Sequence, residues 1–120
     1  MKFVNDTPPE LFTLANDADV ESIAAQLPQL RAIALQFPKW VDGRAYSQAR
    51  LLRSRYRFRG EIRAVGEVLV DMLPMLQRTG FDAVQLRSDQ DEAAARRALA
   101  FFPAGHYQGD VTRPLPKFAR

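Results

Sequence analysis

Polar side chains gather in one stretch of the chain, directly after an apolar run that ends at residue 37. Those able to contact an anion or other small ligand are Lys39, Asp42, Gly43, Arg44, Tyr46 and Ser47. In parallel α/β folds, ligands bind beyond the carboxyl ends of strands, and this stretch is a connection of that kind. Ser47 lies near an expected helix start, where free backbone N–H groups favour negative charge beside Arg44. The stretch predicts an anion site, and we include Arg63 in it.

The same residues also have a purely structural interpretation. Asp42-Gly43 is a common turn sequence, Ser47 is an ordinary helix cap, and Arg44 can form an ion pair with Asp42 or Glu67. Neither a Gly-x-Gly-x-x-Gly stretch nor a Gly-x-x-x-x-Gly-Lys-Ser/Thr loop occurs in the chain. A self-contained NAD or ATP site is therefore not expected.

Among the carboxylates, Glu67 is the best candidate for acid or base chemistry. It follows Gly66 at an expected strand end, with Asp71 one helical turn later. A carboxylate in the first turn of a helix also complements the helix dipole without any catalytic role. Glu67 is thus a weak catalytic candidate, and no catalytic motif accompanies it.

Seven arginines lie between Arg44 and Arg63, interleaved with three aromatic residues. Such a composition can bind single-stranded nucleic acid through phosphate contacts and base stacking. Tyr56, however, belongs to an apolar helical stripe, and the arginines fall on several faces. A solvated basic helix or a surface for an acidic partner is favoured over RNA binding.

Composition excludes several kinds of redox centre. The 120 residues contain no cysteine, which removes thiolate catalysis and cysteine-ligated zinc or iron–sulfur sites. The single histidine, His106, cannot form a His-rich metal site within one chain. We therefore expect no resident metal and identify no cofactor. The net charge of +3 permits anionic ligands without requiring nucleic acid.

The sequence carries no signal for export or membrane insertion. An acid and the Pro8-Pro9 pair interrupt the amino-terminal segment before a signal-peptide-like apolar region can form, and no apolar run approaches membrane-spanning length. A cytoplasmic protein is expected.

The periodicity of apolar residues predicts four strand–helix repeats. Strands are expected at residues 10–14, 31–37, 61–65 and 82–87. Helices are expected from residue 16 or 17 to 27, over 46–57, from 68 to about 80, and from 88 or 89 to 101 or 102. Pro28 should end the first helix, and Pro74 should kink or split the third because proline lacks a backbone donor.

This order indicates one α/β domain, residues 1–120, with a mostly parallel sheet. Sequential strand order with helices on one face would resemble half of an eight-fold barrel, and a reversal would give a small doubly wound sheet. The half-barrel order is slightly preferred. Residues 103–120, rich in proline and glycine, are expected to form an irregular arm. Because open sheet edges need cover, we expect a homodimer.

Many motifs in the chain resemble one bacterial family. They include Phe37-Pro38, Asp42-Gly43-Arg44, Tyr46-Ser47, Ala49-Arg50, Leu52-Arg53, Gly60-Glu61, Arg63-Ala64, Gly66, Asp71, Gly80-Phe81-Asp82 and Tyr107-Gln108. The chain is similar to the bacterial domain of unknown function number nine-three-four over most of its length after about residue 30. Ala45, Glu67, Met72 and Thr79 depart from the family pattern, so no catalytic role is expected at Met72 or Thr79.

The resemblance implies a role in sulfite reduction, since similar proteins are described as oxidoreductases and are encoded beside assimilatory sulfite reductase. A chain without cysteine or a dinucleotide motif would serve as an accessory or anion-binding partner of sulfite reductase or another sulfur-assimilation enzyme. The alternatives are a small oxidoreductase or other enzyme with a pocket between Lys39, Arg44, Arg63 and Glu67, and RNA binding through the arginine-rich helix.

Overall fold

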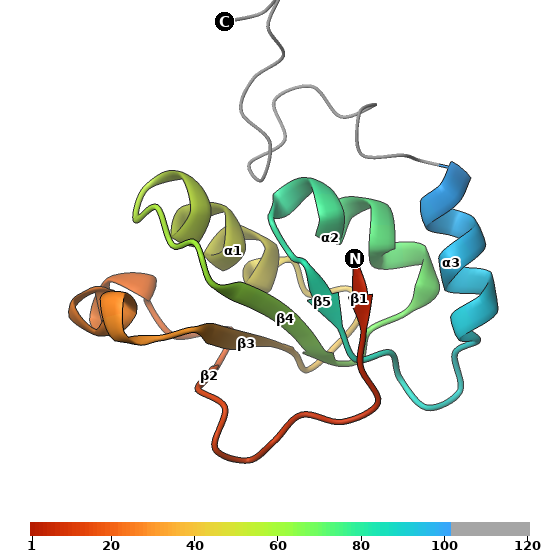
Figure 1. Ribbon diagram of the computed structural model, residues 1–120, viewed down its shortest axis with the longest axis horizontal. Coiled ribbons are helices and arrows are strands. Elements are labelled where there is room, and N and C mark those ends of the chain that lie inside the picture. Colours follow the sequence, from red (N-terminus) through yellow and green to blue (C-terminus); the bar gives the residue numbers. More distant parts are fainter. Residues whose placement is uncertain (102–120) are drawn as a thin grey trace, which may run out of the picture.

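A computed structural model describes residues 1–101 of the chain. Its centre is a sheet of five parallel strands in the order β1-β5-β4-β3-β2 (Figure 1). The strands are β1 (Lys2–Phe3), β2 (Thr13–Leu14), β3 (Ala32–Phe37), β4 (Glu61–Gly66) and β5 (Ala83–Val84). The α/β class with a parallel sheet is confirmed. The four expected strands are neighbours in sequential order, as in a half-barrel, and β1 adds to them beside β5.

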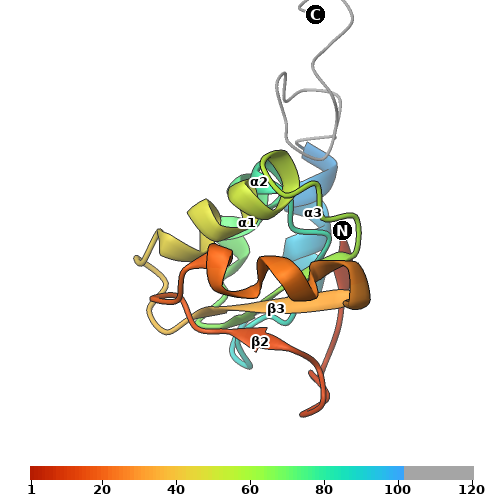
Figure 2. The ribbon, with the colours of Figure 1, turned by 90° about the vertical axis from the view of Figure 1, so that its left-hand side faces the viewer.

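Helical segments connect strands β2 through β5 on one side of the sheet, and a last helix follows β5. They are η1 (Val20–Gln29), α1 (Arg44–Ser54), η2 (Val70–Met72), α2 (Leu73–Thr79) and α3 (Glu92–Phe101). Figure 2 shows η1, α1 and α2 on the same side of β3. Parallel neighbours need a long crossover, and right-handed crossovers between strands placed in sequence all fall on one face.

The main core lies between the sheet and these helices. Side chains alternate between the two faces of a strand, so Ile33, Leu35 and Phe37 of β3 point the same way. All three are fully buried and pack in one cluster with residues of η1, α1 and α2. In the β4 register, Leu35 pairs with Ala64, and Ala34 pairs with Arg63. Arg63 therefore lies on the face opposite the helices.

The connection from β1 to β2 crosses that opposite face. We call residues 4–12 the N-terminal strap. Figure 1 shows it, in red, passing from β1 below the sheet to β2. The step from β1 to β2 runs across the sheet in the direction opposite to the steps from β2 through β5. A right-handed crossover in that direction must use the other face.

The first helical segment differs from the sequence prediction. It is a 3-10 helix that contains Pro28 and ends at Gln29, so the expected break at Pro28 is wrong. Leu30 N donates to Leu27 O, which closes the last turn without a donor on the proline. The cap is also later than expected, because Asp19 Oδ1 accepts a hydrogen bond from Glu21 N at 3.0 Å.

The expected effect of Pro74 is confirmed. The third helical segment is split into the 3-10 turn η2 and the helix α2, and Pro74 lies in the first turn of α2. Backbone N–H groups have no helical partner in a first turn, so proline is tolerated there. Gly80 ends α2 with a φ of 114°, a left-handed conformation that glycine adopts without a Cβ penalty.

Other limits of the elements shift as well. The expected strands at 10–14 and 82–87 shorten to β2 and β5, and β1 was not expected from so short a segment. Lys2 N donates to Asp82 O and Val4 N to Val84 O, which fixes β1 against β5. The predicted arm at 103–120 and His106 lie outside the described residues. Within residues 1–101, no helix has the length and apolar character needed to cross a membrane.

Candidate functional site

The loop that follows β3 is held by Asp42. The Asp42 carboxylate accepts hydrogen bonds from Arg44 N at 2.9 Å and from Arg44 Nη2 at 2.8 Å. Asn16 Nδ2 donates to Asp42 Oδ2 at 2.5 Å, which ties this loop to the end of β2. Gly43, the residue before α1, provides no side-chain cap. The first backbone donor of α1 is therefore satisfied by Asp42.

This arrangement places a carboxylate where an external anion was expected. Helix starts bind anions through backbone N–H groups and the helix dipole, and Asp42 provides such a charge internally. Its hydrogen bonds with Arg44 lower the pKa of Asp42 to about 2, so the carboxylate stays charged. The Arg44 side chain is 62% exposed and directs Nε and Nη2 at Asp42. The structure thus brings Asp42, Gly43 and Arg44 together as a turn with an ion pair.

Within residues 1–101, the side chains of Lys39, Tyr46 and Ser47 make no hydrogen bond or ion pair with Asp42 or Arg44. Lys39 and Ser47 are exposed, and their side chains make no hydrogen bond or ion pair within residues 1–101. The Tyr46 ring contacts Phe37 edge-on, with centroids 5.1 Å apart, and also contacts Phe81. Burial raises the pKa of the Tyr46 hydroxyl. Tyr46 therefore packs at the core margin.

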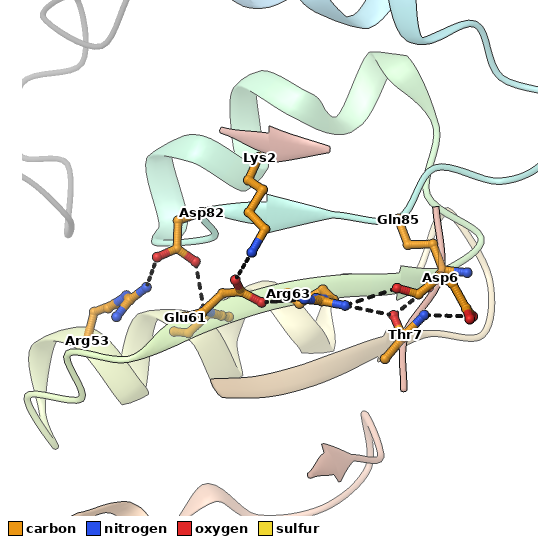
Figure 3. Close-up of polar contacts among 9 residues, drawn as sticks. Lys2, Asp6, Thr7, Arg53, Glu61, Arg63, Asp82 and Gln85 are labelled. Atoms are coloured by element: carbon orange, nitrogen blue, oxygen red, sulfur yellow. Dashed lines mark hydrogen bonds and ion pairs between the residues drawn. The ribbon is translucent and has the colours of Figure 1, made fainter. Parts of the chain in front are cut away.

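Arg63 is on the opposite face of the sheet and contacts the N-terminal strap (Figure 3). Only 8% of the residue is exposed. Its Nη2 lies 2.9 Å from Glu61 Oε2, and its Nη1 donates to Asp6 O at 3.2 Å and to Thr7 Oγ1. Thr7 in turn donates its hydroxyl to Gln85 Oε1 at 2.5 Å. Arg63 thus joins β4 to the strap and does not meet the Arg44 loop.

Glu67 also has a partner. Its Oε1 lies 3.3 Å from Arg87 Nη1 at the carboxyl end of the sheet. Arg87 makes two further hydrogen bonds with Asp89, from Nε at 2.6 Å and from Nη2 at 2.8 Å. These bonds raise the pKa of Arg87 and lower that of Asp89 to about 2. Glu67 therefore belongs to a three-residue ion network.

The arginine-rich segment does not form one binding face. Arg53 is largely enclosed, donating to the carbonyl oxygens of Gly80, Phe58 and Gly60, and burial lowers its pKa. Arg53, like Arg63, therefore uses its guanidinium for contacts within the fold. The remaining arginines between residues 50 and 59 are exposed, but only Arg50 lies on α1, and Arg55, Arg57 and Arg59 follow its end at Ser54.

Two apolar side chains that sequence reasoning did not single out stand on the surface of the β3–α1 loop. Trp40 is 54% exposed and Val41 is 67% exposed. We call residues 38–43 the Trp40 loop. The Asp42 contacts with Arg44 and Asn16 fix its carboxyl-terminal half. The sequence did contain a signal for this exposed surface, because Trp40 lies between Lys39 and Asp42 in a segment expected to be a connection.

A second feature that the sequence did not reveal is a crevice of about 410 Å³ at the carboxyl end of the sheet. Its lining comes from the ends of β1, β4 and β5 and from the start of α3: Phe3, Val4, Asn5, Gly66, Gln85, Leu86, Arg87, Ser88, Gln90 and Glu92. Within residues 1–101, no cluster of three or more metal-binding side chains occurs. The lining combines polar side chains, such as those of Asn5, Gln85 and Ser88, with apolar ones, such as Leu86.

A family comparison matches most of the chain. The model for a bacterial protein of unknown function (DUF934) matches residues 12–118. The chain belongs to this family. The match begins within the N-terminal strap and includes β2 through α3. Comparison with curated proteins found no match. Comparison with solved structures found none either.

Proposed function

We propose that this chain is an accessory protein of assimilatory sulfite reduction that docks onto a partner enzyme through the Trp40 loop. The observation that supports docking is the exposure of Trp40 and Val41 on a loop fixed by Asp42. Tryptophan and arginine are the residues most enriched at the energetic centres of protein interfaces. The Trp40 loop and the adjoining Arg44 provide both.

Preorganisation strengthens this interpretation. A partner that binds a fixed loop does not pay the entropy of ordering it. Three nitrogens of Arg44 donate to Asp42: Nε, Nη2 and the backbone N. Asn16, in the turn that follows β2, donates to the same carboxylate. The backbone beside Trp40 is thus braced by two elements of the fold.

The link to sulfite reduction rests on the family resemblance, and the accessory role rests on the sequence. The chain has no cysteine and one histidine, so it cannot supply a cysteine-ligated electron carrier. An accessory protein needs only a recognition surface. In this role the chain would position or stabilise the reductase and leave electron transfer to it.

Binding to purified assimilatory sulfite reductase tests the proposal. Trp40 is the only tryptophan of the chain, but a partner has its own, so a 5-fluorotryptophan label followed by fluorine NMR isolates its signal. We expect the Trp40 resonance to shift and broaden on titration with the reductase. Trp40→Ala should weaken binding, measured by calorimetry, by at least about tenfold, because interface tryptophans often contribute more than 2 kcal/mol.

Leu51→Ala provides the matched control. Leu51 is another large exposed apolar residue, but it lies on α1 outside the loop. Its replacement should leave the affinity within about twofold of wild type. Equal losses in both variants, or no binding by the wild-type chain, would refute docking through the Trp40 loop.

We also propose that the chain forms a homodimer. Within residues 1–101, the sheet ends at β1 and β2, two strands of two residues each, and an edge strand can pair with a strand of another chain. Light scattering at increasing concentration tests this. A constant mass of one chain would contradict it.

A further inference from the structure

The crevice at the carboxyl end of the sheet lies where two neighbouring strands, β1 and β5, send the chain to opposite faces. After β1 the chain enters the N-terminal strap, which Arg63 holds on the face away from the helices. After β5 the chain turns toward α3, whose Ala95 joins the main core and whose Arg96 stacks on Phe3 at 4.8 Å. Strands β1 and β5 are direct neighbours. Their connections therefore diverge and leave space between them.

Open parallel sheets bind ligands at such a divergence because no connection covers it. The lining of the crevice includes Val4 and Asn5, which follow β1, and residues 85–88, which follow β5. Gly66 contributes backbone without a side chain at the end of β4. The volume of about 410 Å³ is in the range of small-molecule sites.

The charges in the lining are already compensated. Arg87 is bonded to both Asp89 and Glu67. Glu92 Oε2 lies 2.9 Å from Arg96 Nη2. A free anion would have to compete with two carboxylates for Arg87, and no unpaired carboxylate of the lining is left for a cation. The crevice is therefore suited to an uncharged ligand.

Uncharged polar groups remain available. The side chains of Asn5 and Ser88 make no hydrogen bond within residues 1–101. Gln85 has its Oε1 engaged by Thr7, and its Nε2 has no partner in that part of the chain. Thr7 is itself contacted by Arg63, so the strap fixes the orientation of the Gln85 amide (Figure 3). Amides and a hydroxyl beside apolar Leu86 recognise hydroxyl, carbonyl and ring-nitrogen acceptors.

We propose that this crevice binds a small uncharged molecule with several hydrogen-bonding groups, of the sugar or nucleoside class. This site is separate from the Trp40 loop and does not depend on docking to a reductase. Gln85, Asn5 and Ser88 would contact the ligand. Arg63 and Thr7 act as positioning residues through Gln85.

Nitrogen-15 NMR of the full-length chain tests the proposal with ribose and adenosine as neutral probes and sulfate as the anionic probe at fixed ionic strength. We expect a neutral probe to shift the Asn5 and Gln85 side-chain amides and the Ser88 backbone amide in a saturable manner. Sulfate should produce no saturable shift there.

Paired substitutions locate the site. Asn5→Ala with Ser88→Ala should weaken the neutral probe about tenfold, because each lost hydrogen bond reduces affinity by a factor of several. Gln36→Ala with Ser47→Ala removes the same kinds of group from exposed positions outside the lining and should change nothing. Sulfate binding at these amides, equal losses in both double variants, or no response to either neutral probe would overturn the proposal.

Discussion

Replacing Arg63 by methionine should lower the free energy of unfolding, because the hydrogen bonds of the guanidinium are lost. The size of the loss can be worked out from those contacts. Methionine retains much of the aliphatic stem that covers the sheet and removes only the charged head. The head contacts Glu61 at 2.9 Å and Asp6 O at 3.2 Å. A hydrogen bond to a charged group contributes roughly 1.5–3 kcal/mol and a neutral one about 1 kcal/mol.

The carboxylate of Glu61 would not be left alone in this variant. Lys2 Nζ stays 3.1 Å from Glu61 Oε1, so the full cost of an orphaned buried charge does not arise. We therefore expect a loss of about 2–4 kcal/mol in the free energy of unfolding. For a chain of this length, that corresponds to a melting temperature lower by roughly 8–16 °C.

Urea denaturation measures the loss in the free energy of unfolding, and hydrogen–deuterium exchange measures the loosening of the N-terminal strap. Exchange in the N-terminal strap, residues 4–12, should accelerate in Arg63→Met because its anchor to β4 is lost. Arg44→Ala is the control, since its ion pair with Asp42 is solvent-exposed and should contribute little to stability. If Arg63→Met loses less than about 0.5 kcal/mol, the strap is not held by Arg63, and the reasoning is refuted.

Three further predictions follow from the loop and strand ends. Sulfate, sulfite and phosphate should change the melting temperatures of wild type and Arg44→Ala equally at fixed ionic strength, because Asp42 already occupies the helix start; a shift present only in wild type would support an external anion site instead. The Asp42 and Asp89 pKa values lie near 2, below their ordinary 3.8, so their stabilising contribution is complete above about pH 4 and is lost as pH falls through 2; Asp42→Asn should flatten that part of an acid-unfolding profile, and an unchanged slope would contradict the assignment. Gly66→Ala should lower stability by at least about 1–2 kcal/mol, because φ is +100° and a Cβ would lie 2.5 Å from Phe37 O, whereas Gly43→Ala, with open space around it, should be nearly neutral in thermal unfolding.

The amino-acid sequence predicted the elements that depend on local pattern. The apolar run at 31–37 became β3, because a buried parallel strand requires apolar residues on both faces. The strand expected at 61–65 became β4, in which Ile62 and Ala64 are buried and Arg63 lies on the face opposite the helices. Pro74 also predicted the division between η2 and α2. This prediction was local too, because it rests on the backbone donor that proline lacks. The Asp42–Arg44 pair was also among the alternatives that the sequence indicated.

Only the tertiary structure decided the location of Arg63 and the shape of the carboxyl end of the sheet. The β1 strand forms because the backbone N–H groups of Lys2 and Val4 donate to residues about 80 positions away. A strand of two residues has no apolar periodicity from which it could be predicted. Once β1 lies beside β5, the handedness of crossovers sends the strap to the face opposite the helices. That placement buries Arg63, orients Gln85 and opens the crevice. The sequence could not show it, because it depends on a long-range strand pairing that no local pattern contains.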